Sequence, residues 1–279
     1  MNFDKIFNQI EEVDPEVFGR MDTRRSAMKE FAGMAGKVAV ASIPLMLGSM
    51  FKKAYAGASM RGPLDVLNFA LTLEYLESNF YNMGSSNSSL IPSADAPGIG
   101  LIVSDEAKHV IFLQTAISGA GGTPVAQSSF KYDFTAGGTF NDVFTNYDTF
   151  LAVAQAFEDT GVRAYKGQAG YLIGTGAILT AALNIHSVEA RHASHIRQIR
   201  HLRGAMVKPW ITLAQTGINS PAVNASYAGE DNTSIAGMML VGINGHTEID
   251  ANAVSEAFDE ILTTDQVVAI AKNFITQGL

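Results

Sequence analysis

The sequence of 279 residues contains no cysteine, and this absence excludes several kinds of site. Disulfide scaffolds, thiol catalysis, cysteine-ligated zinc and iron–sulfur clusters all require a sulfur that the chain does not have. Any bound metal ion must therefore be held by histidine and carboxylate side chains. That set of donors suits iron, manganese or zinc better than Cu(I).

Basic residues are also scarce, since 19 lysines and arginines stand against 27 acidic residues and give a net charge of −8. Binding of nucleic-acid phosphates needs a basic face, so we expect no nucleic-acid partner. Glycine-rich phosphate loops and nucleotide-binding fingerprints are missing as well. The main apolar run, residues 38–50, is short and contains Pro44, so we expect no stable membrane span in the mature protein.

The N-terminal segment has the order of an export signal. Arg24 and Arg25 are followed by an apolar stretch and then by Ala-Tyr-Ala at residues 54–56, a small-x-small cleavage site. The paired arginines resemble a twin-arginine signal, although Ala27 and Met28 stand where such signals have a larger apolar pair. We therefore predict an export signal over residues 1–56 that directs the protein to the periplasm or cell envelope. An uncleaved anchor or a packed amphipathic helix is the alternative.

After this segment the apolar pattern becomes helical. Residues at three- and four-residue steps share one face over four segments, and a connection of about thirty residues between the second and third suits a bundle with one long crossover. We expect a bundle domain at 57–203 and a loop-rich C-terminal extension at 204–279, with a last helix that begins at a capping box from Thr263 to Gln266. The expected bundle helices cover about 63–84, 104–118, 148–166 and 178–203, and Ser104 and Asp105 are the expected caps of the second.

The first and second pairs of helices repeat the same polar residues. In the first helix of each pair a glutamate is followed about two turns later by a tyrosine, and the second helix carries Glu-x-x-His. Nearly the same interval separates the two glutamates in each pair. The repeated residues are Glu74, Tyr81, Glu106 and His109 in one pair and Glu158, Tyr165, Glu189 and His192 in the other.

The position of these groups predicts a metal centre. Glu74 lies on the apolar stripe of Leu67 and Leu71, where an unpaired carboxylate would cost several kcal/mol or be protonated. Residues three apart lie on one helix face, so each Glu-x-x-His pair can hold one cation, and Glu74 and Glu158 would complete or bridge the site. The alternatives are a solvated helix face with chance spacing, or salt bridges of Glu74 and Glu158 to Arg163 or Arg191.

One glutamate from each of two helices, plus Glu-x-x-His from each of the other two, is the ligand set of ferritin-like di-iron and di-manganese proteins. Over residues 60–275 the sequence resembles the exported ferritin-like proteins related to plant desiccation-associated proteins, most clearly at residues 73–77, 157–159 and 257–260. The resemblance implies an all-α fold, a ferritin-like four-helix bundle. It also implies two metal ions, iron or manganese with zinc possible, bound by Glu74, Glu106, His109, Glu158, Glu189 and His192.

Four further residues are candidates for a supporting role. Glu77 lies one turn from Glu74 and could replace it as a ligand, whereas His186 could be an extra ligand, a hydrogen-bond donor to a ligand or a core histidine. Tyr81 and Tyr165 either bond ligand carboxylates or only pack. In the C-terminal extension, Glu230, His246 and Asp250 are scattered among loop residues, and we expect all three to be solvated.

The resemblance implies three possible functions. The first is an oxidoreductase whose metal pair reacts with O₂ or peroxide. The second is a metal-sequestering or stress-related protein without turnover, and the third is a structural envelope protein. A homo-oligomer is possible, but a cage of 24 subunits would leave little room for the C-terminal extension.

Overall fold

The computed structural model describes residues 26–30, 62–235 and 237–279. Most of the predicted export signal therefore lies outside the described residues. The short helical segment at 26–30 is the described part of it, and its Ala27 is buried against Leu240, Ile249 and Val254 of the C-terminal extension.

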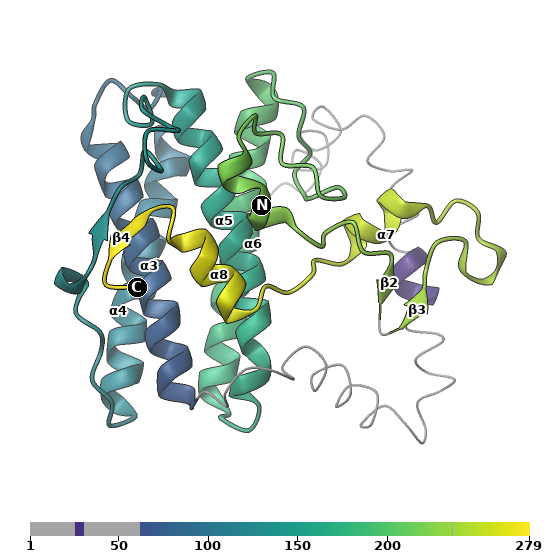
Figure 1. Ribbon diagram of the computed structural model, residues 1–279, viewed down its shortest axis with the longest axis horizontal. Coiled ribbons are helices and arrows are strands. Elements are labelled where there is room, and N and C mark those ends of the chain that lie inside the picture. The colour runs from purple at the N-terminus through teal and green to yellow at the C-terminus, as the bar shows by residue number, and fades with distance from the viewer. Residues whose placement is uncertain (1–25, 31–61, 236) are drawn as a thin grey trace.

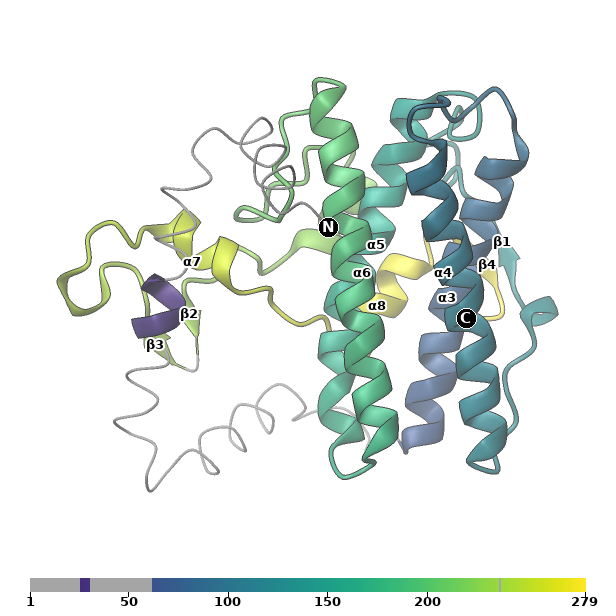
Figure 2. The same ribbon diagram turned by 180° about the vertical axis from the view of Figure 1, so that it is seen from behind.

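Four long helices form the bundle (Figures 1 and 2). Helices α3 and α4 pack as one pair, and α5 and α6 pack as the other. No helix in the described ranges is long and apolar enough to cross a lipid bilayer. The architecture confirms the predicted all-α bundle with one long crossover and a loop-rich C-terminal extension. The helices are α3 (Pro63–Ser86), α4 (Ala96–Gly119), α5 (Tyr147–Ala169) and α6 (Ala177–Leu202).

Helix α4 begins earlier than the sequence pattern predicted. We expected it to start near Ser104, because Ser104 and Asp105 are residues that favour a helix cap. In the structure Pro97 lies within the first turn, where its missing N–H would have no intrahelical partner in any case. Asp105 is therefore inside the helix, on a face that can reach α6.

The crossover between α4 and α5 holds the C-terminus of the chain. It contains η1 (Gln127–Ser129) and β1 (Lys131–Tyr132), and β1 pairs antiparallel with β4 (Ile275–Gln277). Between α5 and α6 lies only η2 (Gly170–Leu172).

The C-terminal extension has two parts (Figures 1 and 2). A distal lobe, which contains β2 (Ser234–Ile235), β3 (Met238–Met239) and α7 (Ala251–Ala257), lies to one side of the bundle. Helix α8 (Thr264–Ala271) instead crosses the face formed by α3 and α5. The predicted capping box of α8 is present, since Thr263 and Gln266 each bond the other's backbone N–H. The remaining elements of the extension are η3 (Pro221–Tyr227) and η4 (Ile243–Gly245).

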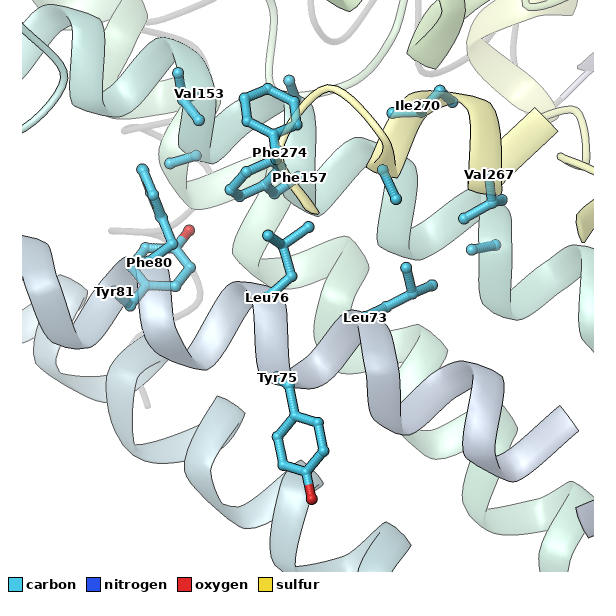
Figure 3. Close-up of a cluster of buried hydrophobic side chains, with 14 of the residues drawn as sticks. Leu73, Tyr75, Leu76, Phe80, Tyr81, Val153, Phe157, Val267, Ile270 and Phe274 are labelled. Atoms are coloured by element: carbon cyan, nitrogen blue, oxygen red, sulfur yellow. The ribbon is translucent and has the colours of Figure 1, made fainter. Parts of the chain in front are cut away.

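Aromatic side chains fill the space between α3, α5 and the end of the chain (Figure 3). The ring of Phe80 stacks on Phe150 with centroids 4.7 Å apart, and Phe157 meets Phe274 edge to face at 4.7 Å. Helices α3 and α5 are thereby covered on the side that faces away from α4 and α6. The carboxylates of Glu74 on α3 and Glu158 on α5 are therefore far from water and must find partners inside the protein.

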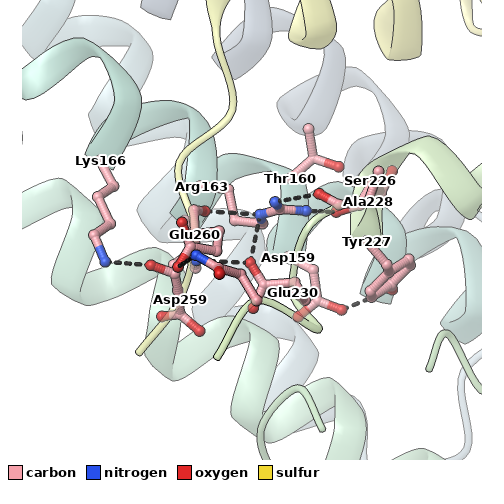
Figure 4. A network of polar contacts seen from close by, with 12 residues as sticks. Asp159, Thr160, Arg163, Lys166, Ser226, Tyr227, Ala228, Glu230, Asp259 and Glu260 are labelled. Atoms are coloured by element: carbon pink, nitrogen blue, oxygen red, sulfur yellow. Dashed lines mark hydrogen bonds and ion pairs between the residues drawn. The ribbon is translucent and has the colours of Figure 1, made fainter. Parts of the chain in front are cut away.

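A buried arginine fastens the extension to α5 (Figure 4). The guanidinium of Arg163 donates to the carbonyl oxygens of Ser226, Ala228 and Glu260 and forms an ion pair with Glu230 at 2.7 Å. The expectation that Glu230 is solvated was wrong, because its side chain is completely buried. Arg163 is also unavailable as the salt-bridge partner of Glu74 or Glu158, because these contacts turn it toward the extension.

Candidate metal centre

The two Glu-x-x-His pairs and the two single glutamates meet inside the bundle, with ligand atoms from all four long helices. The carboxylates of Glu74, Glu106, Glu158 and Glu189 are fully buried, and His109 and His192 are 7% and 6% exposed. A solvated helix face is therefore not the environment of these residues.

The side chains form two groups of four, and within each group the ligand atoms lie within 4.8 Å of one another. Glu106 and Glu189 belong to both groups. The sequence left open whether Glu74 and Glu158 complete or bridge the site, and this arrangement favours Glu106 and Glu189 as the bridging carboxylates. The first group is Glu74, Glu106, His109 and Glu189, and the second is Glu106, Glu158, Glu189 and His192.

Both histidines face the carboxylates with the same ring nitrogen. Nδ1 of His109 lies 3.1 Å from Glu74 Oε2, 3.3 Å from Glu106 Oε2 and 3.3 Å from Glu189 Oε1. Nδ1 of His192 lies 2.8 Å from Glu106 Oε1 and 3.4 Å from Glu158 Oε2. Each imidazole therefore presents its Nδ1 to one group of carboxylates.

Several of these atoms are close to each other yet form no hydrogen bond. Within the described part of the chain, Nδ1 of His192, Oε1 of Glu106, Oε2 of Glu158 and both oxygens of Glu189 are buried without a hydrogen-bond partner. Unpaired buried polar atoms are rare in proteins and require an explanation. A set of histidine and carboxylate donors that converge without pairing fits divalent cations, which would bind their lone pairs.

Two tyrosines orient the outer carboxylates, those of Glu74 and Glu158, which each belong to one group only. Each tyrosine bonds the glutamate of the other helix pair. The hydroxyl of Tyr81 on α3 donates to Glu158 Oε1 on α5 at 2.5 Å, and that of Tyr165 on α5 donates to Glu74 Oε1 on α3. Each glutamate thus keeps one oxygen oriented by a tyrosine while the other oxygen faces a histidine. Burial is the main cause that raises the pKa of both tyrosines well above the usual value, so both remain protonated donors.

The protonation states of the glutamates and histidines in the centre depend on one another. Burial raises the pKa of Glu74 to about 7 and that of Glu189 well above its usual value. Although burial opposes ionisation of Glu106, its closeness to His109 and His192 holds the pKa of Glu106 at about 2. Burial likewise opposes protonation of His192, but the charge of Glu158 raises the pKa of His192 to about 11. Without a cation the carboxylates must share protons with the histidines, and a cation would displace those protons.

Asp105 is a functional candidate that the sequence pattern missed. Its Oδ2 lies 3.6 Å from Nε2 of His192, the ring nitrogen opposite the one that faces the carboxylates. A carboxylate at this position orients a ligating imidazole and raises its basicity. The signal in the sequence is the Asp-Glu-x-x-His order, which we took for a helix cap. At the matching position of α6, just before Glu189, stands Val188.

Glu77 and His186 lie outside both groups in the described part of the chain. Glu77 is 4% exposed, and burial followed by the charge of Glu189 raises its pKa well above the usual value. It faces Gly161, where an added Cβ would lie 2.9 Å from Glu189 Oε2 and 3.3 Å from Glu77 Oε1. His186 instead places Nδ1 2.9 Å from the carbonyl oxygen of Val162.

Comparisons with known proteins agree with this geometry. A search of curated proteins returned no match to the chain. The family model described as ferritin-like domain matches residues 62–202, just over half of the chain. This match covers the four bundle helices together with all six residues of the two groups. The chain therefore belongs to the ferritin-like family.

Proposed function

We propose that this is an exported ferritin-like protein that binds two iron or manganese ions and reacts with O₂ or peroxide. One observation carries the proposal: two groups of four buried donors share Glu106 and Glu189. Shared carboxylates hold two cations close together, and a pair of redox-active ions can exchange electrons with a small oxidant in pairs.

The residues of this chain have separate tasks in the proposal. Glu106 and Glu189 would hold both cations, while Glu74 with His109 and Glu158 with His192 would each complete one position. Tyr81 and Tyr165 keep the outer carboxylates in place. Burial of the whole set excludes bulk water, so only a small molecule reaches the centre. Zinc would suit the same donors but has no redox chemistry, which is why iron and manganese are preferred.

The export part of the proposal rests on the N-terminal sequence. Arg24 and Arg25, the apolar run and the Ala-Tyr-Ala at 54–56 have the order of a cleaved twin-arginine signal. A twin-arginine route carries folded proteins, so the cations could be inserted before export. N-terminal sequencing of the protein from the cell envelope of its host should begin at or near Gly57, and an intact Met1 there would refute cleavage.

The chemistry is tested by loading the metal-free protein anaerobically with Fe(II) or Mn(II) and then adding air or peroxide. We expect the loaded protein to consume oxidant faster than the same concentration of free ion, with an absorbance change in the near ultraviolet or visible range. Turnover with manganese alone would indicate a catalase-type dismutation, and turnover with iron alone would indicate ferroxidase or peroxidase work. If both forms bind two ions but neither outpaces the free ion, metal sequestration replaces the enzymatic proposal.

A further inference from the structure

An apolar cavity lies between the four bundle helices, beside the candidate metal centre. About 20 Å³ of it is open to the centres of water-sized molecules. Side chains of α3, α4, α5 and α6 line it, among them Leu67, Ala70, Phe112, Tyr165 and Ala182.

The walls of the cavity offer little to a water molecule. Its polar side chains are those of Tyr165 and Gln168; the Tyr165 hydroxyl is already bonded to Glu74, and the amide nitrogen of Gln168 donates to Thr264 Oγ1 at 3.2 Å. The oxygen of Gln168 is the remaining acceptor there without a hydrogen bond among the described residues. A buried water needs two to four polar partners, so this cavity favours a dry, apolar occupant.

The walls of the cavity extend from the protein surface to the neighbourhood of the centre. Phe112 in its wall is 40% exposed, whereas Tyr165 in the same wall is 6% exposed and reaches Glu74 with its hydroxyl. A molecule in the cavity is therefore separated from the first group of donors by one tyrosine ring.

We propose that this cavity binds a dioxygen-sized apolar molecule and that the centre receives its oxidant as O₂ through it, an inference that rests on the proposed function. Dioxygen makes no strong hydrogen bonds and loses little when it leaves water. Hydrogen peroxide is polar and would lose its hydrogen bonds to water without finding partners in these walls. The cavity therefore selects between the two oxidants that the metal centre could use.

Xenon, an apolar atom that occupies dry cavities, is the direct probe of the site. Crystals of the metal-free protein under xenon pressure should show xenon between Ala70, Tyr165 and Ala182. The variant Ala182→Phe fills the space and should lose that xenon, whereas Leu183→Phe, at a neighbouring position that is 46% exposed and outside the cavity, should keep it. Absence of xenon from this cavity in the unmodified protein would overturn the inference.

Kinetics test the route. In Fe(II)-loaded protein, Ala182→Phe should slow the reaction with O₂ by about tenfold and leave the reaction with hydrogen peroxide unchanged, with both cations still bound. Equal slowing with both oxidants, or no slowing with O₂, would overturn the inference. Because the larger ring can overpack the bundle, Ala182→Leu serves as a milder variant with the same expected order of effects. Xenon in the cavity of a protein that consumes no oxidant would refute the proposed function and leave the apolar site standing.

Discussion

The two helix pairs of the bundle carry the same polar residues on the faces that meet inside the bundle. They carry different residues on the faces that point outward. On the inner faces Glu74 corresponds to Glu158, and Tyr81 corresponds to Tyr165. These side chains also do the same thing, because each tyrosine bonds the glutamate of the other pair. The repeated residues are those that a cation pair would need, so a shared site in the middle explains why both halves have them.

One outward contact between α5 and α6 is an ion pair, whereas the corresponding contact between α3 and α4 joins two neutral polar side chains. Asp159 forms an ion pair with Arg197 at 2.6 Å and accepts a hydrogen bond from Tyr227 of the extension at 2.7 Å. The corresponding residues of the first pair are Tyr75 and Gln114, which bond each other at 2.8 Å. Only the second pair thus carries the buried charges that attach η3 to the bundle, which shows that the outer faces follow local packing rather than the metal centre.

The two groups of donors are themselves unequal. Asp105 of α4 lies beside His192, whereas the matching position in the sequence of α6 is Val188. Glu77 likewise has Gly161 as its counterpart, and the small residue leaves the room that the Glu77 and Glu189 carboxylates occupy. The predictions that follow test how far this inequality extends.

The largest effect is expected from loss of a shared carboxylate. Glu189→Ala removes a donor from both groups, so the purified protein should retain less than one metal ion by elemental analysis after loading with Fe(II) or Mn(II). Glu158→Ala removes a donor from one group and should retain about one ion. If the two variants lose the same amount of metal, Glu189 does not bridge.

A smaller effect should follow from loss of the carboxylate behind His192. Asp105→Asn should lower the affinity of one of the two cation positions by about 10- to 100-fold and leave the affinity of the other unchanged. The reason is that Asp105 lies beside His192, which belongs to one group only. Anaerobic titration calorimetry with Mn(II) would then show two separated binding steps. Lys108→Met is the control, since the Lys108 ammonium contacts the other oxygen of Asp105 from a position 67% exposed. Equal weakening of both steps would contradict the inequality of the positions.

A change in stability rather than in metal content is expected at Glu77. Because burial raises the folded-state pKa of Glu77 above 4.5, folding of the metal-free protein is most favoured with Glu77 protonated and loses stability as pH rises above about 4.5. Glu77→Gln should therefore stabilise the metal-free protein by about 1–4 kcal/mol at neutral pH, the range seen when buried charges are replaced, with the gain vanishing near pH 4.

Thermal unfolding after chelator treatment, followed from pH 4 to pH 8, measures this gain. Glu248→Gln is the matched control, because the Glu248 side chain is 49% exposed and should change stability little at any pH. A gain for Glu77→Gln that does not depend on pH would mean that ionisation of Glu77 is not its cause. Loss of a cation in Glu77→Gln would instead make Glu77 a ligand.

The inner faces were predictable from the sequence because helical spacing fixes which residues share a face. The repeated glutamate, tyrosine and Glu-x-x-His positions could be assigned to one centre before any contact was known. Asp105 was missed because its role depends on where α4 begins, and the interpretation of Ser104 and Asp105 as helix caps placed that start too late.

Glu230 shows a different limit of sequence reasoning. Its partner Arg163 lies on α5, far away in the sequence, and the loop around Glu230 has no periodicity that would indicate burial. Strands β1 and β4 could not be predicted from the sequence either. Two or three residues are too few to show an alternating pattern, and the pairing of these strands joins distant parts of the chain. Contacts of this kind are set by tertiary packing alone.

The smallest and most specific effect should come from the exchanged tyrosines. Tyr81→Phe removes one hydrogen bond to Glu158, and Tyr165→Phe removes one to Glu74; each should cost about 1 kcal/mol of stability. Because Glu158 and His192 belong to the same group, Tyr81→Phe should weaken the cation position at His192, although Tyr81 itself lies on the opposite helix pair. A double-mutant cycle separates the two positions, because neighbours couple and distant sites add. Tyr81→Phe combined with Asp105→Asn should be non-additive in manganese affinity, whereas Tyr165→Phe with Asp105→Asn should be additive. The reverse pattern would mean that each tyrosine acts on its own helix pair, and the reciprocal exchange across the bundle would then have no role in metal binding.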